Sequence, residues 1–339
     1  MRAAVALCLL GALVAPAAGA QPPPALPRVS AFYYPWYGTP VADGGYAHWQ
    51  QNGHEPPWSI ASAFYPARGP YSSSDRRVLE EQMRELDRAG VDQVIASWWG
   101  RGSPEDARLQ ALIETARRSS LEVAVHVEPY GGRTPASVEG DAAYLAGLGI
   151  SELYVYGPTD TPAEEWAALN DGVPSMRIFA QTALAGFAAA GHFDGLYTYD
   201  ILVFGGGRFG RLCLQARRRG LRCAPSVGPG YDASRAVGDA RLKPRRDGRT
   251  YDAMWSAALH ARADAVTITS YNEWHEGTQI EPARATALRD GRRYAGYDGA
   301  YGARGRAAES AYLDRTAYWS ARFAAGASAN VHRGLLALR

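Results

Sequence analysis

The feature that most constrains this chain is a regular alternation of strand-like and helix-like segments. The strand-like segments are short and rich in β-branched and aromatic residues, whereas the helix-like segments repeat apolar residues every three or four positions. The predicted strands cover 29–34, 91–98, 122–127, 152–156, 176–180, 193–198, 222–227 and 265–269. The predicted helices cover 76–89, 103–119, 137–148, 183–190, 208–219, 251–261 and 307–324.

Eight strands alternating with helices over about 300 residues predict an α/β fold, a single-domain (β/α)8 barrel spanning residues 28–339. The rival architecture is an open doubly wound sheet, which usually carries a Gly-rich phosphate-binding turn after its first strand. Here the first strand runs into Tyr34-Pro35-Trp36-Tyr37-Gly38, which is a poor phosphate cradle. The Arg-rich segment 235–249 is most simply a solvated surface loop.

The N-terminus has the pattern of a secretory signal peptide. Arg2 is followed by an uncharged, mostly apolar run over 3–14 and then by Ala18-Gly19-Ala20, so we expect cleavage after residue 20. The alternative is a buried N-terminal helix. The apolar run is shorter than the roughly 20 residues that a membrane-spanning helix needs, so we expect a secreted or periplasmic protein without a stable membrane anchor.

The segment after the signal peptide, 21–27, is a Pro-rich leader. Export would permit a disulfide between Cys213 and Cys223, although a spacing of ten residues does not establish one.

The charge balance and the aromatic content indicate which kinds of molecule the protein could bind. The chain has 36 Lys and Arg against 34 Asp and Glu, a net charge of +2, which argues against a dedicated nucleic-acid binder. Its 9 Trp and 20 Tyr far outnumber its 8 Phe. Rings with a polar atom suit a wet site that stacks on ligand rings, although they also fill cores.

The chemically distinctive segments follow the predicted strands. In a barrel, catalytic residues lie at the C-terminal ends of strands. Aromatic, acidic and amide side chains gather at 34–38, 98–100, 128–130, 197–200, 228–232 and 271–276. This coincidence of position and chemistry predicts an active site at that end of the barrel.

The last of these segments contains two carboxylates, Glu273 and Glu276, three residues apart. On a regular strand they would face opposite sides, whereas on a turn of helical geometry their Cβ atoms lie about 5–6 Å apart. Two carboxylates that share a site separate each other's pKa values, which yields one acid and one base, and glycosidases need such a pair. The alternative is that Glu276 or Glu281 only caps a following helix or forms a salt bridge. The neighbouring Tyr, Asn, Trp and His residues favour the catalytic interpretation.

Other residues have two interpretations each. Glu128 is a second candidate acid, or it forms a buried salt bridge with Arg133. The aromatic residues Trp36, Trp49, Trp98, Trp99, Tyr199 and Tyr231 could stack on sugar rings, although some must belong to the core.

Metal and serine chemistry are poorly supported. The histidines His48, His54, His126 and His275 fall in no metal-ligand spacing such as HExxH, so we expect no metal and no cofactor. The sequence contains no GxSxG nucleophile elbow. A metal-dependent hydrolase nevertheless remains an alternative hypothesis for the function.

These motifs together resemble glycoside hydrolase family 99, the endo-α-mannosidases and endo-α-1,2-mannanases. The resemblance is carried by YYPWYG at 33–38, HW at 48–49, FYP at 64–66, YSSSD at 71–75, HVEPY at 126–130, YVY at 154–156, FDGLYTY at 193–199, PSVGPGYD at 225–232 and TSYNEWHEGTQIEPA at 269–283. The motifs occur in family order and span nearly the whole chain after the leader.

The resemblance implies a (β/α)8 barrel, no metal, and retention of anomeric configuration. It implies hydrolysis of an internal α-1,2-mannosidic bond of α-mannan or a high-mannose glycan, with release of a Man- or Glc-α-1,3-Man disaccharide. By position Glu273 would deprotonate the 2-hydroxyl of the substrate, which closes to a 1,2-anhydro sugar, and Glu276 would be the general acid and base. The expected substrate-binding residues are Tyr34, Trp36, Tyr37, His48, Trp49, Trp99, Glu128, Tyr130, Tyr199, Tyr231, Asn272 and His275.

The chain departs from the animal members at three places. The stretch between Tyr130 and Tyr154 is shorter, and Gly157 stands where an aspartate is expected. The second strand ends in Trp98-Trp99 rather than Trp-Tyr, which is similar to bacterial members that favour mannose over glucose in the distal position. We expect a monomeric enzyme, with a non-catalytic α-mannoside-binding protein on the same barrel as the alternative.

Overall fold

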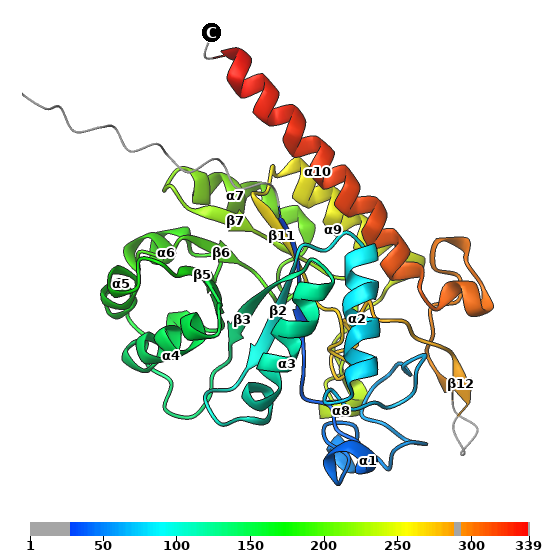
Figure 1. The fold of residues 1–339 in the computed structure, drawn as a ribbon. Helices are drawn as coiled ribbons and strands as arrows, with labels where there is room; N and C mark the ends of the chain where they lie inside the picture. Colours follow the sequence, from blue (N-terminus) through cyan, green and yellow to red (C-terminus); the bar gives the residue numbers. More distant parts are fainter. Residues whose placement is uncertain (1–27, 288–292, 338–339) are drawn as a thin grey trace, which may run out of the picture.

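The computed structural model of the chain describes residues 28–287 and 293–337, and it shows a barrel of parallel strands surrounded by helices (Figure 1). The predicted signal peptide and leader lie outside the described residues. Among the described helices, none combines the length and the apolar character that crossing a membrane requires.

The strands pair in the order β7-β6-β5-β4-β3-β2-β1-β11-β8, and every pair in this sheet is parallel. Their bounds are β1 Arg28–Tyr33, β2 Gln93–Trp98, β3 Glu122–Val127, β4 Glu152–Val155, β5 Arg177–Gln181, β6 Gly195–Tyr197, β7 Arg222–Ala224, β8 Ser226–Val227 and β11 Ala265–Ile268. β7 and β8 are two parts of the predicted seventh strand, divided by Pro225. β7 pairs with β6 and β8 pairs with β11, so the sheet closes into the predicted eight-stranded barrel.

Pro225 explains why the seventh strand is divided. Proline has no backbone N–H, so it cannot continue the donor side of a ladder. Its carbonyl still accepts a hydrogen bond from the Thr267 N–H at 3.2 Å, which keeps the strand attached to β11.

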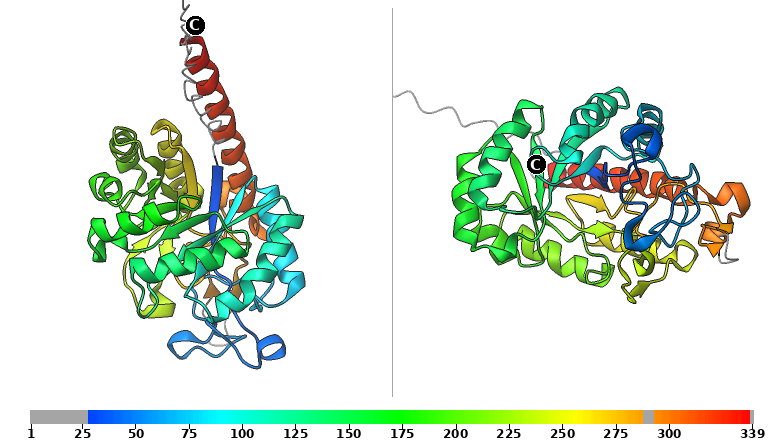
Figure 2. Two further views of the ribbon diagram at one scale, coloured as in Figure 1. Left: turned by 60° about the vertical axis from the view of Figure 1, so that its left-hand side comes forward. Right: turned by 90° about the horizontal axis from the view of Figure 1, so that it is seen from below.

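A helix follows each barrel strand, and the right-hand view of Figure 2 shows these helices around the sheet. Their bounds are α2 Arg76–Arg88, α3 Pro104–Arg118, α4 Pro135–Gly147, α5 Ala163–Gly172, α6 Ala185–Ala190, α7 Phe209–Arg217, α9 Arg249–His260 and α10 Ala311–Ala337. Asp75, Ser103 and Thr134 accept backbone N–H bonds at the starts of α2, α3 and α4, as N-caps do. α10 extends past the body of the barrel (Figure 1).

Sequence analysis missed α5. This helix buries only Trp166 and Leu169, so its apolar stripe is too sparse to give a helical signal. The packing of Trp166 against Phe193, with ring centroids 5.7 Å apart, holds it in place.

Most residues of the segment 235–249 are exposed, as predicted, but the segment is not a simple loop. The segment contains α8 (Ser234–Val237) and β10 (Leu242–Lys243), which pairs with β9 (Tyr231–Asp232). The guanidinium of Arg245 lies over Phe64, Tyr297 and Tyr312 at 4.5–4.8 Å from their centroids. It also donates to the carbonyls of Gly277 and Gln279, so it fixes the loop that follows β11.

The remaining elements cover the ends of the barrel and its outside. α1 (Pro40–Asp43) and α8 lie together at the end of the barrel where β1 ends, and β12 (Thr286–Ala287) pairs with β13 (Arg293–Tyr294) to one side (Figure 1). Cys213 of α7 and Cys223 of β7 form a disulfide, which resolves the question that their spacing had left open.

The barrel interior is aromatic close to its C-terminal end. Phe32 of β1 contacts the rings of His126, Tyr154, Tyr197 and Tyr199, at centroid distances of 4.7–6.1 Å. These side chains come from β1, β3, β4, β6 and the end of β6, so they form one layer across the barrel. They make a rigid floor beneath the residues that follow the strands.

Candidate active site

Both predicted carboxylates lie on one turn. The chain leaves β11 at Ile268 and turns through 271–277, where Gly277 has φ +63°. A Cβ on Gly277 would lie 2.8 Å from the carbonyl oxygen of Asp232, so the turn requires glycine there. No helix follows this turn in the described part of the chain before α10 except short 3-10 segments, so Glu276 is not a helix cap.

Glu273 is almost fully enclosed, with 3% exposure. Its backbone N–H donates to Ser270 Oγ at 2.8 Å. Its own Oε1 accepts a hydrogen bond from the His275 N–H at 2.9 Å. The carboxylate therefore has a fixed orientation on the turn.

Glu276 faces a cavity of about 150 Å³. Tyr199 donates to Glu276 Oε2 at 3.3 Å, and the backbone carbonyl of Glu276 accepts from the Asp232 N–H at 2.8 Å. The cavity is lined by Tyr156, Tyr199, Asp200, Ile201, Leu202, Tyr231, Arg241, Thr269 and Glu276. The carboxylate of Glu276 is therefore reachable from this open space.

The two carboxylates have raised pKa values. Burial and the nearby charge of Asp200 raise the pKa of Glu276 to about 7, with Glu128 adding to the effect. Burial and the charge of Glu276 raise the pKa of Glu273 well above its usual range. Two buried carboxyls that share a site separate each other's pKa values, so that one can serve as an acid and the other as a base in general acid–base chemistry.

Tyr34 and Tyr199 connect the two sides of the site. Their hydroxyls are in direct hydrogen-bond contact, and the Tyr199 hydroxyl also donates to Glu276. Burial is the main cause that raises the pKa of both tyrosines, so both remain neutral hydroxyls at physiological pH.

Trp36, His48 and His275 form a stack beside Glu273. Trp36 lies 4.4 Å from His48 at an interplanar angle of 9°, and 5.7 Å from His275. Burial lowers the pKa of each histidine to about 4. His275 Nε2 donates to the His48 carbonyl at 2.7 Å, which fixes the Nε2–H tautomer of the neutral ring. The stack therefore supplies flat apolar faces rather than positive charge.

Tyr37, Trp49 and Asn272 are enclosed behind this stack. Tyr37 stacks on Trp49 at 4.1 Å, and Trp49 Nε1 donates to the Tyr71 carbonyl at 2.8 Å. Asn272 accepts from the Tyr34 N–H at 2.7 Å and donates to the Tyr34 carbonyl at 3.1 Å. These residues hold the strand ends together in the structure, and direct contact with substrate stays a prediction for them.

Glu128 belongs to a buried polar group, and the alternative interpretation, a salt bridge with Arg133, was wrong. Glu128 Oε1 accepts from Ser97 Oγ at 2.8 Å and lies 3.0 Å from His126 Nδ1. Arg133 instead donates to the carbonyls of Val127 and Tyr156 at 3.1 and 2.6 Å. The ring of His126 stacks on Tyr199, with centroids 5.4 Å apart. A chain of contacts from Glu128 through His126 and Tyr199 therefore leads to Glu276.

Of three further predicted residues, Tyr231 lies at the Glu276 cavity and the other two lie farther out. Tyr231 lines the Glu276 cavity and donates to Asp239 at 2.9 Å. Tyr130 is in hydrogen-bond contact with Asp141, and its ring meets Trp98 edge-on at 5.9 Å. Trp99, just after β2, is 39% exposed. The described contacts do not join Tyr130 or Trp99 to either carboxylate.

Sequence analysis missed three ionisable residues of the cavity, which are Tyr156, Asp200 and Arg241. Asp200 is the last residue of 197–200, a segment that sequence analysis had placed at the active-site end of the barrel. Its position after a strand could therefore have identified it as a candidate site residue. Tyr156 ends the YVY motif. Arg241 had no signal, because it lies in the segment interpreted as a solvated loop. In the described part of the chain, no three His, Cys, Asp or Glu side chains gather as metal ligands.

Comparisons with known proteins agree with this geometry. A family model described as glycosyl hydrolase family 99 matches residues 27–148 and 153–325. A Danio rerio protein, described as glycoprotein endo-alpha-1,2-mannosidase-like protein, is 34% identical over 74% of this chain and 70% of its own length. The Homo sapiens protein of the same description is 33% identical over 75% and 68%.

A solved structure gives the same result for the fold. The family 99 endo-alpha-mannosidase from Bacteroides thetaiotaomicron, in complex with bis-tris-propane, superposes with a TM-score of 0.79 at 29% identity. The match covers 89% of this chain and 98% of that chain. The predicted (β/α)8 barrel and the resemblance on which the sequence interpretation rested are confirmed.

Proposed function

Because the chain belongs to glycoside hydrolase family 99, we propose that it is an endo-α-mannosidase that cleaves an internal α-1,2-mannosidic bond of α-mannan or of a high-mannose glycan. The chain is a glycoside hydrolase, and the mannosidase relatives support mannose glycans as its substrates. The proposed product is a Man- or Glc-α-1,3-Man disaccharide.

One observation carries the proposal: Glu273 and Glu276 lie on one buried turn with raised pKa values. A pKa of about 7 leaves Glu276 half protonated at neutral pH, so it can donate a proton to a leaving glycosidic oxygen. Once Glu276 is protonated it no longer repels the charge on Glu273, which favours the ionised form of Glu273. The pair can thus act as one acid and one base.

In the first step of the proposed mechanism, Glu273 accepts the proton of the substrate's 2-hydroxyl. The O2 atom attacks C1 as the C1–O bond breaks, and Glu276 gives its proton to the departing oxygen. In an α-mannoside O2 and the leaving oxygen are trans and axial, so O2 can attack from the opposite side. The result is a 1,2-anhydro sugar, a protonated Glu273 and an ionised Glu276.

In the second step, Glu276 takes a proton from water, and the water oxygen attacks C1. The C1–O2 bond opens and O2 recovers its proton from Glu273. Both carboxyl groups return to their initial states. Two inversions at C1 give net retention, without a carboxylate bonded to the sugar.

The aromatic residues would bind the sugars around this pair. Trp36, with His48 and His275, offers a flat face beside Glu273, and Tyr231 and Tyr199 border Glu276. Trp99 is exposed and available for a distal sugar, for which we propose mannose rather than glucose. We propose a monomer as the active form.

Two substrate analogues distinguish this mechanism from one in which a carboxylate attacks C1 as the nucleophile. A 2-deoxy substrate lacks O2, so the proposed enzyme should not cleave it, whereas its 2-hydroxyl parent is cleaved. A 2-fluoro sugar with an activated leaving group should leave both glutamates unlabelled by mass spectrometry. Cleavage of the 2-deoxy substrate at a rate near that of the parent, or a sugar adduct on Glu273, would contradict the anhydro route.

We also propose that the protein is secreted or periplasmic after removal of residues 1–20. The Cys213–Cys223 disulfide supports this, because such bonds persist in oxidising compartments. N-terminal sequencing of the exported protein should begin at Gln21. Recovery of the full-length chain only from the cytoplasm would contradict the proposal.

A further inference from the structure

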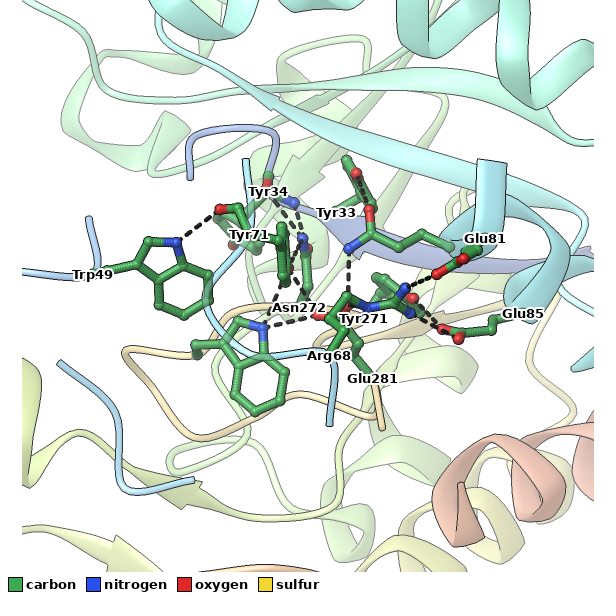
Figure 3. A network of polar contacts seen from close by, with 12 residues as sticks. Tyr33, Tyr34, Trp49, Arg68, Tyr71, Glu81, Glu85, Tyr271, Asn272 and Glu281 are labelled. Carbon is green, nitrogen blue, oxygen red and sulfur yellow. Dashed lines mark hydrogen bonds and ion pairs between the residues drawn. The ribbon is translucent and has the colours of Figure 1, made fainter. Parts of the chain in front are cut away.

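Another buried glutamate, Glu281, lies behind the turn 271–277, here called the catalytic turn, at the centre of a polar network (Figure 3). It is fully buried, with 0% exposure, and nothing in the proposed mechanism uses it. Oε1 accepts from Arg68 Nε at 3.0 Å and from Gln82 Nε2 at 2.8 Å. Oε2 accepts from Tyr71 Oη and Trp274 Nε1, both at 2.8 Å.

Four donors occupy the four lone-pair sites that an ionised carboxylate has, two on each oxygen. Burial raises the pKa of Glu281, and the positive charge of Arg68 is the largest effect that opposes it. A protonated carboxyl could not accept all four bonds, because one oxygen would carry a hydrogen of its own. The geometry is therefore that of a charged group held inside the protein by complete hydrogen bonding.

The network is anchored on α2. Arg68 also pairs with Glu85 at 2.7 Å and with Glu81 at 2.6 Å. Tyr271, at the start of the catalytic turn, donates to Glu85 Oε2 at 2.6 Å. Glu281 thus connects a helix, the long segment between β1 and α2, and the segment after β11.

The contacts of Glu281 end on both chain neighbours of Glu273. Trp274 is held directly through its indole N–H. Asn272 is held through Tyr71, because Asn272 Nδ2 donates to Tyr71 Oη at 3.2 Å (Figure 3). Tyr37 closes the arrangement: its hydroxyl donates to the Asn272 carbonyl and accepts from the Trp274 N–H, both at 3.1 Å.

We propose that Glu281 is a positioning residue that fixes Asn272 and Trp274 and so aims the carboxylate of Glu273 at the substrate. This rests on the proposed function, since Glu273 is a base only in that mechanism. The sequence left Glu281 as a helix cap or a salt-bridge partner. It does form an ion pair with Arg68, and the positioning role is an addition to that pair. A carboxylate misplaced by about 1 Å can lower a rate about 100-fold, because the reacting atoms must lie at contact distance.

Glu281→Gln tests the proposal. The amide keeps the size of the side chain, but its NH₂ group meets two donors where an oxygen stood. We expect kcat to fall about 10- to 100-fold while KM changes less than about threefold, because alignment of the base matters in the transition state and not for binding. Ligand affinity, measured by calorimetry with a non-hydrolysed α-mannoside, should remain close to that of the wild type.

Tyr71→Phe is a second and milder variant, in case Glu281→Gln does not fold. It removes only the hydroxyl that joins Glu281 to Asn272, so a fall in kcat of about 3- to 10-fold without a matching rise in KM is expected. Tyr65→Phe is the matched control. Tyr65 is a buried tyrosine of the same segment whose hydroxyl donates to the Pro57 carbonyl at 3.0 Å, outside the network. Its kcat should equal that of the wild type.

The outcomes separate the two proposals. If the folded Glu281→Gln and Tyr71→Phe enzymes keep wild-type kcat, or lose activity only through KM, the positioning role is wrong although the proposed function stands. If Tyr65→Phe lost as much kcat as Tyr71→Phe, the positioning role would also be wrong. The loss would then follow from removing any tyrosine hydroxyl of this segment, and not from breaking the Glu281 network. If the wild-type protein cleaves no α-mannoside, the proposed function itself fails and the role of Glu281 with it.

Discussion

The pKa of Glu276 offers a quantitative test, because the structure names what raises it. Asp200 is the largest cause after burial, and Asp200 Oδ1 accepts from the Leu202 and Val203 N–H groups at 2.8 and 3.1 Å. Asp200→Asn keeps an oxygen for these two bonds and removes the charge. A negative charge opposes ionisation of Glu276, so its removal must lower the pKa of Glu276.

The size of the effect follows from the raised value. The shift from 4.5 to about 7 corresponds to about 3 kcal/mol against the charged form. Burial is the largest cause. For the like charge of Asp200 we use a shift on the order of one pKa unit, which is typical of a nearby charge. At pH 7 the protonated fraction of Glu276 would then fall from about one half to about one tenth, and kcat/KM should fall about fivefold. At pH 5 both enzymes would keep Glu276 mostly protonated and differ little.

The assay is the pH dependence of kcat/KM with a mannoside of fixed structure. Its basic limb reports the acid that must be protonated, and that limb should move about one unit toward lower pH in Asp200→Asn. Asp171→Asn, an exposed acid on α5, is the control and should leave the limb in place. A folded Asp200→Asn enzyme with an unmoved basic limb would refute either the role of Asp200 or the assignment of Glu276 as the acid.

Three further predictions use other parts of the structure. Glu273→Gln should lower kcat at least 1,000-fold with ligand binding retained, because it removes the base for the 2-hydroxyl; a loss below tenfold in steady-state kinetics would contradict that role. Replacing Cys213 and Cys223 with alanine should lower the free energy of unfolding by about 2–3 kcal/mol, since the bridge closes a loop of about ten residues; an unchanged denaturant midpoint would contradict this. Trp99→Tyr should raise the Glc-over-Man product ratio from a mixed glycan, and an unchanged ratio would remove Trp99 from the distal subsite.

Most of the barrel could be predicted because the residue pattern of each strand is contained in a short stretch of sequence. The predicted 122–127 strand coincides with β3, and the predicted ends of most other strands lie within one or two residues of the observed ones. α5 could not be predicted, because its helical form depends on Trp166 packing against Phe193 of a distant segment. The arginines of 235–249 gave no signal either, because stacking of Arg245 on three rings depends on contacts far apart in the sequence.

The candidate site, like the fold, has features that the sequence predicts and features that depend on distant contacts. Glu273 and Glu276 could be singled out because their spacing and aromatic neighbours are local. Their pKa values could not, because Asp200 follows β6 and reaches Glu276 only in the closed barrel. Glu281 could not be interpreted from spacing alone, since its partners Arg68, Gln82 and Tyr71 come from another part of the chain.

The central claim is endo-cleavage of an α-mannoside by the Glu273–Glu276 pair. The most direct measurement is digestion of yeast-type α-mannan and of a glucosylated high-mannose glycan, by wild-type enzyme and by Glu276→Gln, with mass and sugar-composition analysis of the products. The account predicts a mannose-containing disaccharide from the wild type and none from the variant, although the variant still binds the glycan. Release of single sugars only, or binding without any product from the wild type, would contradict it.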